Sequence, residues 1–120
     1  MNDNLVQLKK KMGAKWAMFE KLHKIILSAN PNIEYRIFPI YVGYYLGDRN
    51  IAIVYFRGKS VLNNELDLGL GLDKKPKNSR FVDAEYMHYA GVNYSIKLKD
   101  AKEITKKFIS MIKSTADNKE

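Results

Sequence analysis

Leucine alternates with other residues through one stretch of this chain, and that stretch restricts the fold more than any other. Leucines occupy every second position from 66 to 72, with Glu65 in front and one aspartate and two glycines between them. A two-residue period is that of a pleated strand, so the leucines share one face and the acidic residues and glycines the other. The apolar run 51–56 and a Gly58-Lys59 break precede it. We predict two strands joined by a short turn, central in a sheet and covered by helices on the leucine face.

Apolar stripes at both ends of the chain predict two helices. The first stripe recurs at steps of three and four residues over about 4–28, and Gly13 makes a kink near its middle plausible. Asp100 and Glu103 have the spacing of a capping box, with aspartate in place of serine or threonine, and predict that the last helix opens there.

Short apolar or alternating runs fill the region between the helices. Their spans are 33–38, 40–46, 51–56, 65–72, 81–85 and 92–98. Short links between such runs favour an antiparallel meander. The predicted fold class is therefore α+β: an N-terminal helix, a largely antiparallel sheet of five or six strands and a C-terminal helix, with the helices packed on the sheet. We expect 1–120 to be a single domain with frayed ends at 1–4 and 116–120.

Composition limits the classes of function. The chain has no cysteine, which excludes a disulfide framework and a thiolate metal site. Three lysines at 9–11 interrupt the apolar residues near the N-terminus, so we expect no signal peptide there. No apolar run reaches membrane-spanning length. We therefore expect a cytoplasmic protein. The net charge of +8 suits a polyanionic partner such as nucleic acid, but 17 lysines against four arginines suit simple solubility equally well.

Aromatic and basic residues supply the main functional signal. Strand parity places Tyr41 and Tyr45 on one face, with Arg49 at the turn nearby. An aromatic sheet face ringed by cations can hold single-stranded nucleic acid or a nucleotide by stacking and charge. Tyrosine also favours strands without any ligand. The candidate ligand-binding residues are Arg36, Tyr41, Tyr45, Arg49, Arg57, Arg80, Tyr86 and His88.

The last three of these candidates form a separate cluster. Tyr86 and His88 follow Arg80 and precede Gly91, and an imidazole beside tyrosine and arginine could bind phosphate or perform acid–base chemistry. Loop aromatics that pack over a sheet edge are the commoner arrangement. His23 lies on the apolar side of the first helix, far from His88 in sequence and without a carboxylate at ligand spacing, so we expect it at the core edge.

The residues between the central leucines allow a further reading. Glu65 and Asp67 could hold Mg²⁺ for phosphodiester hydrolysis, but the neighbouring strand lacks an acidic-x-lysine element, so we expect both carboxylates to face solvent. Gly69 and Gly71 would let a ligand or a helix approach the backbone, and helix packing is the simpler account. We expect no metal and no cofactor.

The order of segments resembles a known family. A long helix leads into NPNIE, an aromatic strand around Tyr41, the strands IAIVYF and ELDLGLGL, a polar loop, a strand ending Ile96-Lys97-Leu98, and a helix opening with Asp100. Over about residues 19–114 this resembles the bacterial and archaeal family catalogued as domain of unknown function 5655 and labelled predicted transport protein. Members stand alone or are fused to restriction- and defence-type modules, which implies a binding or accessory role near nucleic acid. The resemblance brings no catalytic residues with it, and the final helix here lacks the aromatic end common in that family.

Three functions remain open on these residues. The first is a non-enzymatic binding or accessory domain that contacts nucleic acid or a nucleotide through a basic, tyrosine-rich surface. The second is a small nuclease or toxin-like ribonuclease that uses Tyr86, His88 and Arg80. The third is a structural domain that pairs with a protein partner, or with a second copy of itself, through an exposed sheet edge.

Overall fold

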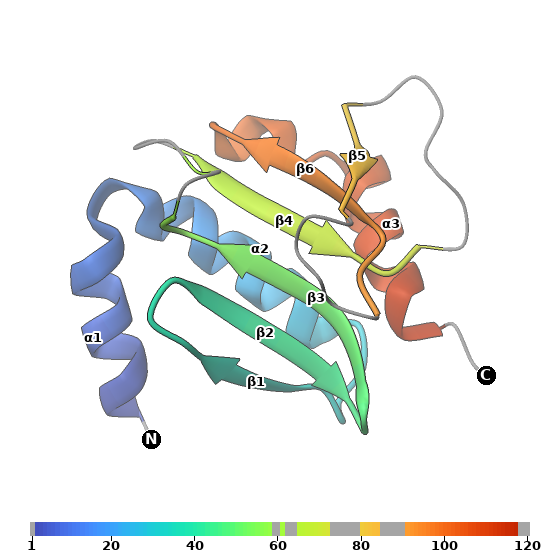
Figure 1. Cartoon of the computed structure of the whole chain (residues 1–120), viewed down its shortest axis with the longest axis horizontal. Helices are drawn as coiled ribbons and strands as arrows, with labels where there is room; N and C mark the ends of the chain where they lie inside the picture. Colours follow the sequence, from blue (N-terminus) through green and yellow to red (C-terminus); the bar gives the residue numbers. More distant parts are fainter. Residues whose placement is uncertain (1, 59–60, 62–64, 73–79, 85–90, 118–120) are drawn as a thin grey trace.

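The sheet is built from the middle of the chain, and the helices at the two chain ends leave one of its faces without a helix (Figure 1). The computed structural model describes residues 2–58, 61, 65–72, 80–84 and 91–117. The helices are α1 (Asn2–Met12), α2 (Trp16–Ser28) and α3 (Lys106–Asp117), with short 3₁₀ turns η1 (Gly13–Lys15) and η3 (Ala101–Glu103). The strands are β1 (Glu34–Ile37), β2 (Tyr41–Leu46), β3 (Arg49–Tyr55), β4 (Leu66–Leu70), β5 (Val82–Asp83) and β6 (Tyr94–Leu98). The predicted α+β class is confirmed.

The strands of the described chain form one antiparallel sheet in the order β1-β2-β3-β4-β6-β5. The first four strands follow the predicted meander, but β6 pairs with β4 and leaves β5 at the edge. Burial explains why β6, rather than β5, pairs with β4. Ile96 and Leu98 of β6 are buried beside Leu68 and Leu66, whereas both residues of β5 are exposed, as suits an edge strand.

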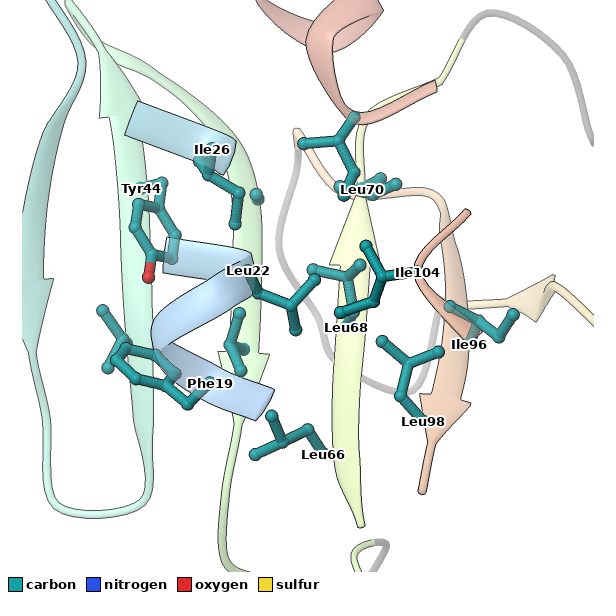
Figure 2. Packing of buried hydrophobic residues seen from close by; sticks show 14 of the residues in the cluster. Phe19, Leu22, Ile26, Tyr44, Leu66, Leu68, Leu70, Ile96, Leu98 and Ile104 are labelled. Carbon is teal, nitrogen blue, oxygen red and sulfur yellow. The ribbon is translucent and has the colours of Figure 1, made fainter. Parts of the chain in front are cut away.

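The central leucines lie under the helices, as predicted. Leu66, Leu68 and Leu70 are fully buried, and Leu72 is nearly so. Helix α2 contributes Phe19, Leu22 and Ile26 to the same core, and Ile104 points toward the leucines from the segment before α3 (Figure 2). β3 ends at Tyr55 and β4 begins at Leu66, and the predicted short turn between them lies partly outside the described residues.

The N-terminal helix breaks where the sequence predicts a kink. Gly13 has a φ of 55°, a left-handed conformation that glycine adopts without the usual side-chain penalty. The 3₁₀ turn η1 follows it and redirects the chain into α2. Leu8 and Met12 on α1 are still buried in the main core, so the break keeps both parts of the apolar stripe packed.

The C-terminal helix begins later than predicted. Asp100 accepts a hydrogen bond from the Lys102 backbone N–H at 2.9 Å, but this caps η3 rather than a long helix. Ile104 then leaves helical geometry, with a ψ of 82°, and its side chain is buried in the core. α3 starts only after Thr105, whose Oγ1 accepts from the Phe108 N–H at 3.3 Å.

A close backbone approach, rather than helix packing, accounts for Gly71. A Cβ on Gly71 would overlap the carbonyl oxygen of Gly91, and a Cβ on Gly91 would overlap the carbonyl oxygen of Asn50. These backbone segments therefore meet at a distance that only glycine permits. The expectation that a helix packs against Gly71 is wrong.

Truncation of a central leucine should destabilise the whole domain. We expect Leu68→Ala to lower the free energy of unfolding by about 2–5 kcal/mol, because the surrounding strands and helices cannot fully close the cavity. Val6→Ala is the control, since Val6 is 54% exposed on α1, and it should change stability by less than about 0.5 kcal/mol. Urea denaturation followed by circular dichroism measures both. Equal losses in the two variants would contradict the central role of the leucine face.

Candidate nucleic-acid interface

The sheet has a helix-covered face and an opposite face, here called the second face. Strand register assigns residues to it, because partners across an antiparallel pair point to the same side. The second face carries Glu34 and Arg36 of β1, Tyr41, Gly43 and Tyr45 of β2, Ile53 and Tyr55 of β3, Asp67 and Gly69 of β4, and Ser95 and Lys97 of β6. Three of the predicted ligand residues, Arg36, Tyr41 and Tyr45, therefore share this face.

Three rings on the second face form a stack that we call the aromatic row. The ring centroids of Phe38 and Tyr41 lie 4.6 Å apart with 22° between their planes, and those of Tyr41 and Tyr55 lie 5.0 Å apart at 24°. All three side chains are half-buried. Phe38 is missing from the predicted ligand residues, although alternation from Arg36 places it on the same face. What alternation cannot show is that its ring stacks on Tyr41.

Arg36 shares the second face with this row and contacts Tyr45. Its guanidinium carbon is 4.7 Å from the centroid of the Tyr45 ring, a cation–π distance. The Tyr45 ring lies over Gly43, where any Cβ would meet the tyrosine hydroxyl. Arg36 is exposed, so it keeps a positive charge in solvent while one side of its guanidinium is fixed against Tyr45. Glu34, also exposed, is the register partner of Tyr45.

The middle of the second face is covered by the chain itself. Ile53, Ala84 and Val92 are buried together in a small second core, and Tyr41 and Tyr55 pack against it. Ala84 is held there by its N–H, which donates to the Asn93 carbonyl at 3.0 Å. The accessible part of the face is therefore the β1–β2 side, with Arg36, Phe38 and Tyr45.

A groove borders the aromatic row on this side. It has a volume of about 270 Å³ and lies between α1 and the β1–β2 connection, which are neighbours in Figure 1. Gln7, Leu8 and Lys11 line it from α1, and Ile37, Phe38 and Pro39 line it from the sheet. The lysine run at 9–11 thus brings one cation, Lys11, to the groove that Phe38 lines.

The two strand acids are buried, which corrects the expectation that they face solvent. Glu65 is 5% exposed and Asp67 is 0% exposed. Lysines accompany both: the Lys99 ammonium lies 3.9 Å from a Glu65 oxygen, and Lys97 is the register partner of Asp67. Alternation alone could not reveal this, because it shows which face a residue lies on but not what covers that face. Within the described ranges, no three histidine, cysteine, aspartate or glutamate side chains gather as a metal site.

The remaining predicted residues do not join the aromatic row. Arg49 donates to the Thr115 carbonyl on α3 at 3.3 Å. Arg80 forms an ion pair with Glu103 of η3, and the next residue, Phe81, contacts Phe108 of α3. Arg57 is exposed beyond the end of β3, and Tyr86 and His88 lie outside the described residues. None of the helices within the described ranges has the length and apolar character to cross a membrane.

His23 belongs to the core, as expected. It is 7% exposed, and its Nδ1 lies 2.8 Å from the hydroxyl of the fully buried Tyr44. The rings of Phe19 and Tyr35 enclose it at centroid distances of 5.2 and 4.7 Å. Loss of water around the ring lowers the pKa of His23 to about 4, and Glu20 opposes this only weakly. Burial, with a smaller effect of Tyr35, raises the pKa of Tyr44, so both partners are neutral at pH 7.

His23 should make stability depend on pH in a defined window. Its pKa is about 4 when folded and 6.5 in its reference state, so the unfolded chain binds more protons between these values and stability falls as pH drops from 6.5 to 4. The full effect is at most about 3 kcal/mol. His23→Gln should be less stable at pH 7 but show a flatter dependence, measured by urea unfolding across this window. The carboxylates are the same in both proteins, so a difference in the pH dependence of the unfolding free energy comes from His23. Identical pH dependence in the two proteins would contradict the role of His23.

Comparisons with known proteins give no information on the function of this site. Neither family models, curated protein sequences nor solved structures give a match to this chain.

Proposed function

We propose that this chain is a non-enzymatic binding module that holds single-stranded nucleic acid on the β1–β2 side of the second face. The observation that carries the proposal is the aromatic row lying beside the exposed Arg36–Tyr45 pair, on one face of adjacent strands. Half-exposed aromatic rings next to a fixed cation are the elements with which proteins hold unpaired bases and their phosphates.

The geometry limits where a base can stack. The rings of the aromatic row face one another, so the inner faces of Phe38 and Tyr41 are occupied by their neighbours. Among the described residues two platforms remain: the Phe38 side chain where it lines the groove, and the outer plane of the Arg36 guanidinium, whose inner plane lies on Tyr45. Bases stack on arginine planes as well as on aromatic rings. The proposed site therefore takes one or two bases.

Charge around these platforms suits the phosphate backbone. Lys11 lines the groove beside Phe38, and Arg36 is exposed next to the row. The net charge of +8 attracts a polyanion from a distance. Glu34 on the same face repels phosphate and directs the backbone toward the Lys11 side. We include in this proposal a cytoplasmic location. We also include the family resemblance, whose restriction- and defence-type fusions imply a role near nucleic acid.

Single-stranded oligothymidine of about ten residues tests the proposal by fluorescence anisotropy. Phe38→Ala should weaken binding by about five- to a hundredfold, because a stacked base contributes about 1–3 kcal/mol. Arg36→Ala should weaken it as well and reduce its salt dependence. Lys24→Ala is the matched control for charge, because Lys24 is exposed on α2 and forms a surface ion pair with Glu20.

The outcome against the proposal is equally specific. Binding that is absent at low salt removes the function. Binding that Lys24→Ala weakens as much as Arg36→Ala, with no effect of Phe38→Ala, shows that total charge alone attracts the oligonucleotide.

A further inference from the structure

A second cleft lies away from the aromatic row, where α2 begins. Its volume is about 350 Å³. Ala14, Lys15, Ala17 and Met18 line it from η1 and the first turn of α2, and Lys99, Asp100 and Ala101 line it from the turn that follows β6. Two lysines from distant parts of the sequence thus meet at one cleft, and three alanines leave its walls open to a ligand.

Lys15 has a fixed position in this cleft. Its ammonium donates a hydrogen bond to the Phe56 carbonyl at 2.7 Å, across the end of β3. The half-buried position lowers the pKa of Lys15 by loss of water, Glu65 raises it, and the Arg57 charge lowers it further. The ammonium has three donors, so two remain after the bond to Phe56.

The acids beside the cleft already have partners. Glu65 is buried, with the Lys99 ammonium 3.9 Å away. Asp100 accepts the Lys102 N–H at 2.9 Å and thereby caps η3. Helix α2, described over its whole length, has no acidic residue in its first turn. Glu103 is also close, because its Oε2 accepts the backbone N–H of Lys99 at 3.2 Å, and it is paired with Arg80. Each of these three carboxylates is thus engaged, and the two side chains that bring positive charge to the cleft lining are Lys15 and Lys99.

We propose that this cleft binds a phosphate-type oxyanion, with Lys15 as its fixed donor and Lys99 as its mobile one. Lys15 needs little reordering because the Phe56 carbonyl already holds it. The Lys99 side chain is 63% exposed and can turn from Glu65 toward the anion. A charge partly removed from water also attracts an anion more strongly than a fully solvated one. The phosphate can belong to a small free anion or to a nucleic-acid backbone.

The cleft and the aromatic row are separate sites. They share no residue: Phe38, Tyr41 and Tyr55 are absent from the cleft lining. Failure of oligonucleotide stacking at Phe38 would therefore leave this proposal intact, and the reverse also holds.

Tripolyphosphate is the probe, added to the ¹⁵N-labelled full chain at low salt while amide chemical shifts are recorded. Saturable shifts should appear at 14–18 and 99–101. Lys15→Met keeps the aliphatic stem and removes the charge, so it should raise the dissociation constant about tenfold or more, as expected for a lost charge-assisted hydrogen bond. Lys99→Met should raise it less, since the mobile donor contributes less. Lys24→Met removes the same charge from α2, outside the cleft lining, and should leave the dissociation constant unchanged.

Two results would overturn the proposal: shifts that do not saturate, or equal weakening by Lys15→Met and Lys24→Met. Because Lys15→Met also leaves the Phe56 carbonyl without its donor, its thermal unfolding is measured alongside. If it fails to fold, Lys99→Met compared with Lys24→Met decides in its place. Oligothymidine then identifies the source of the phosphate: Lys15→Met weakens its binding if the cleft takes a nucleic-acid backbone and leaves it unchanged if the ligand is a small anion.

Discussion

Packing of the β4 leucines against the helices determines how every other strand is placed. β4 pairs with β3 on one side and β6 on the other, so its leucine face sets the register of both neighbours. A slip by one residue would bring the buried leucines to the second face and the buried Asp67 into the helix core. The cost of both changes holds the sheet in one register. β3 pairs with β2, and β2 pairs with β1, so the register of β3 also decides which residues of β2 and β1 lie on each face. This places Arg36, Tyr41 and Tyr45 on the second face.

Helices on only one side leave the second face to be covered in another way. Its centre is closed by Ala84 and Val92 over Ile53, which is why an apolar residue can be fully buried on the side opposite the helices. The β1–β2 side has no such cover among the described residues, and its half-exposed rings cover one another instead. Stacking reduces the apolar area in contact with water, yet leaves Phe38 in the wall of a groove. The same arrangement that makes this edge stable also makes it a surface for a planar ligand.

Sequence periodicity predicted the fold well where one physical effect dominates. Two-residue alternation within β4 and the glycine break at Gly13 were both found, because burial and left-handed geometry each act on a short segment. Prediction failed where two segments meet. The strand order depends on whether β5 or β6 offers more apolar surface to β4, and the start of α3 depends on Ile104 reaching the core before the helix can begin. Such preferences are decided by tertiary packing.

The candidate sites show the same limit more strongly. Parity grouped Tyr41 with Tyr45 but could not show that Phe38 stacks on Tyr41, and it gave no reason to join Lys15 to Lys99. Both groupings adjoin the end of β3. Tyr55, its last residue, extends the aromatic row, and the carbonyl of the next residue, Phe56, accepts a hydrogen bond from Lys15. One short strand end therefore supports both proposed sites. A ligand that shifts this strand end from one side changes the geometry on the other, and any resulting coupling of the two affinities must be reciprocal.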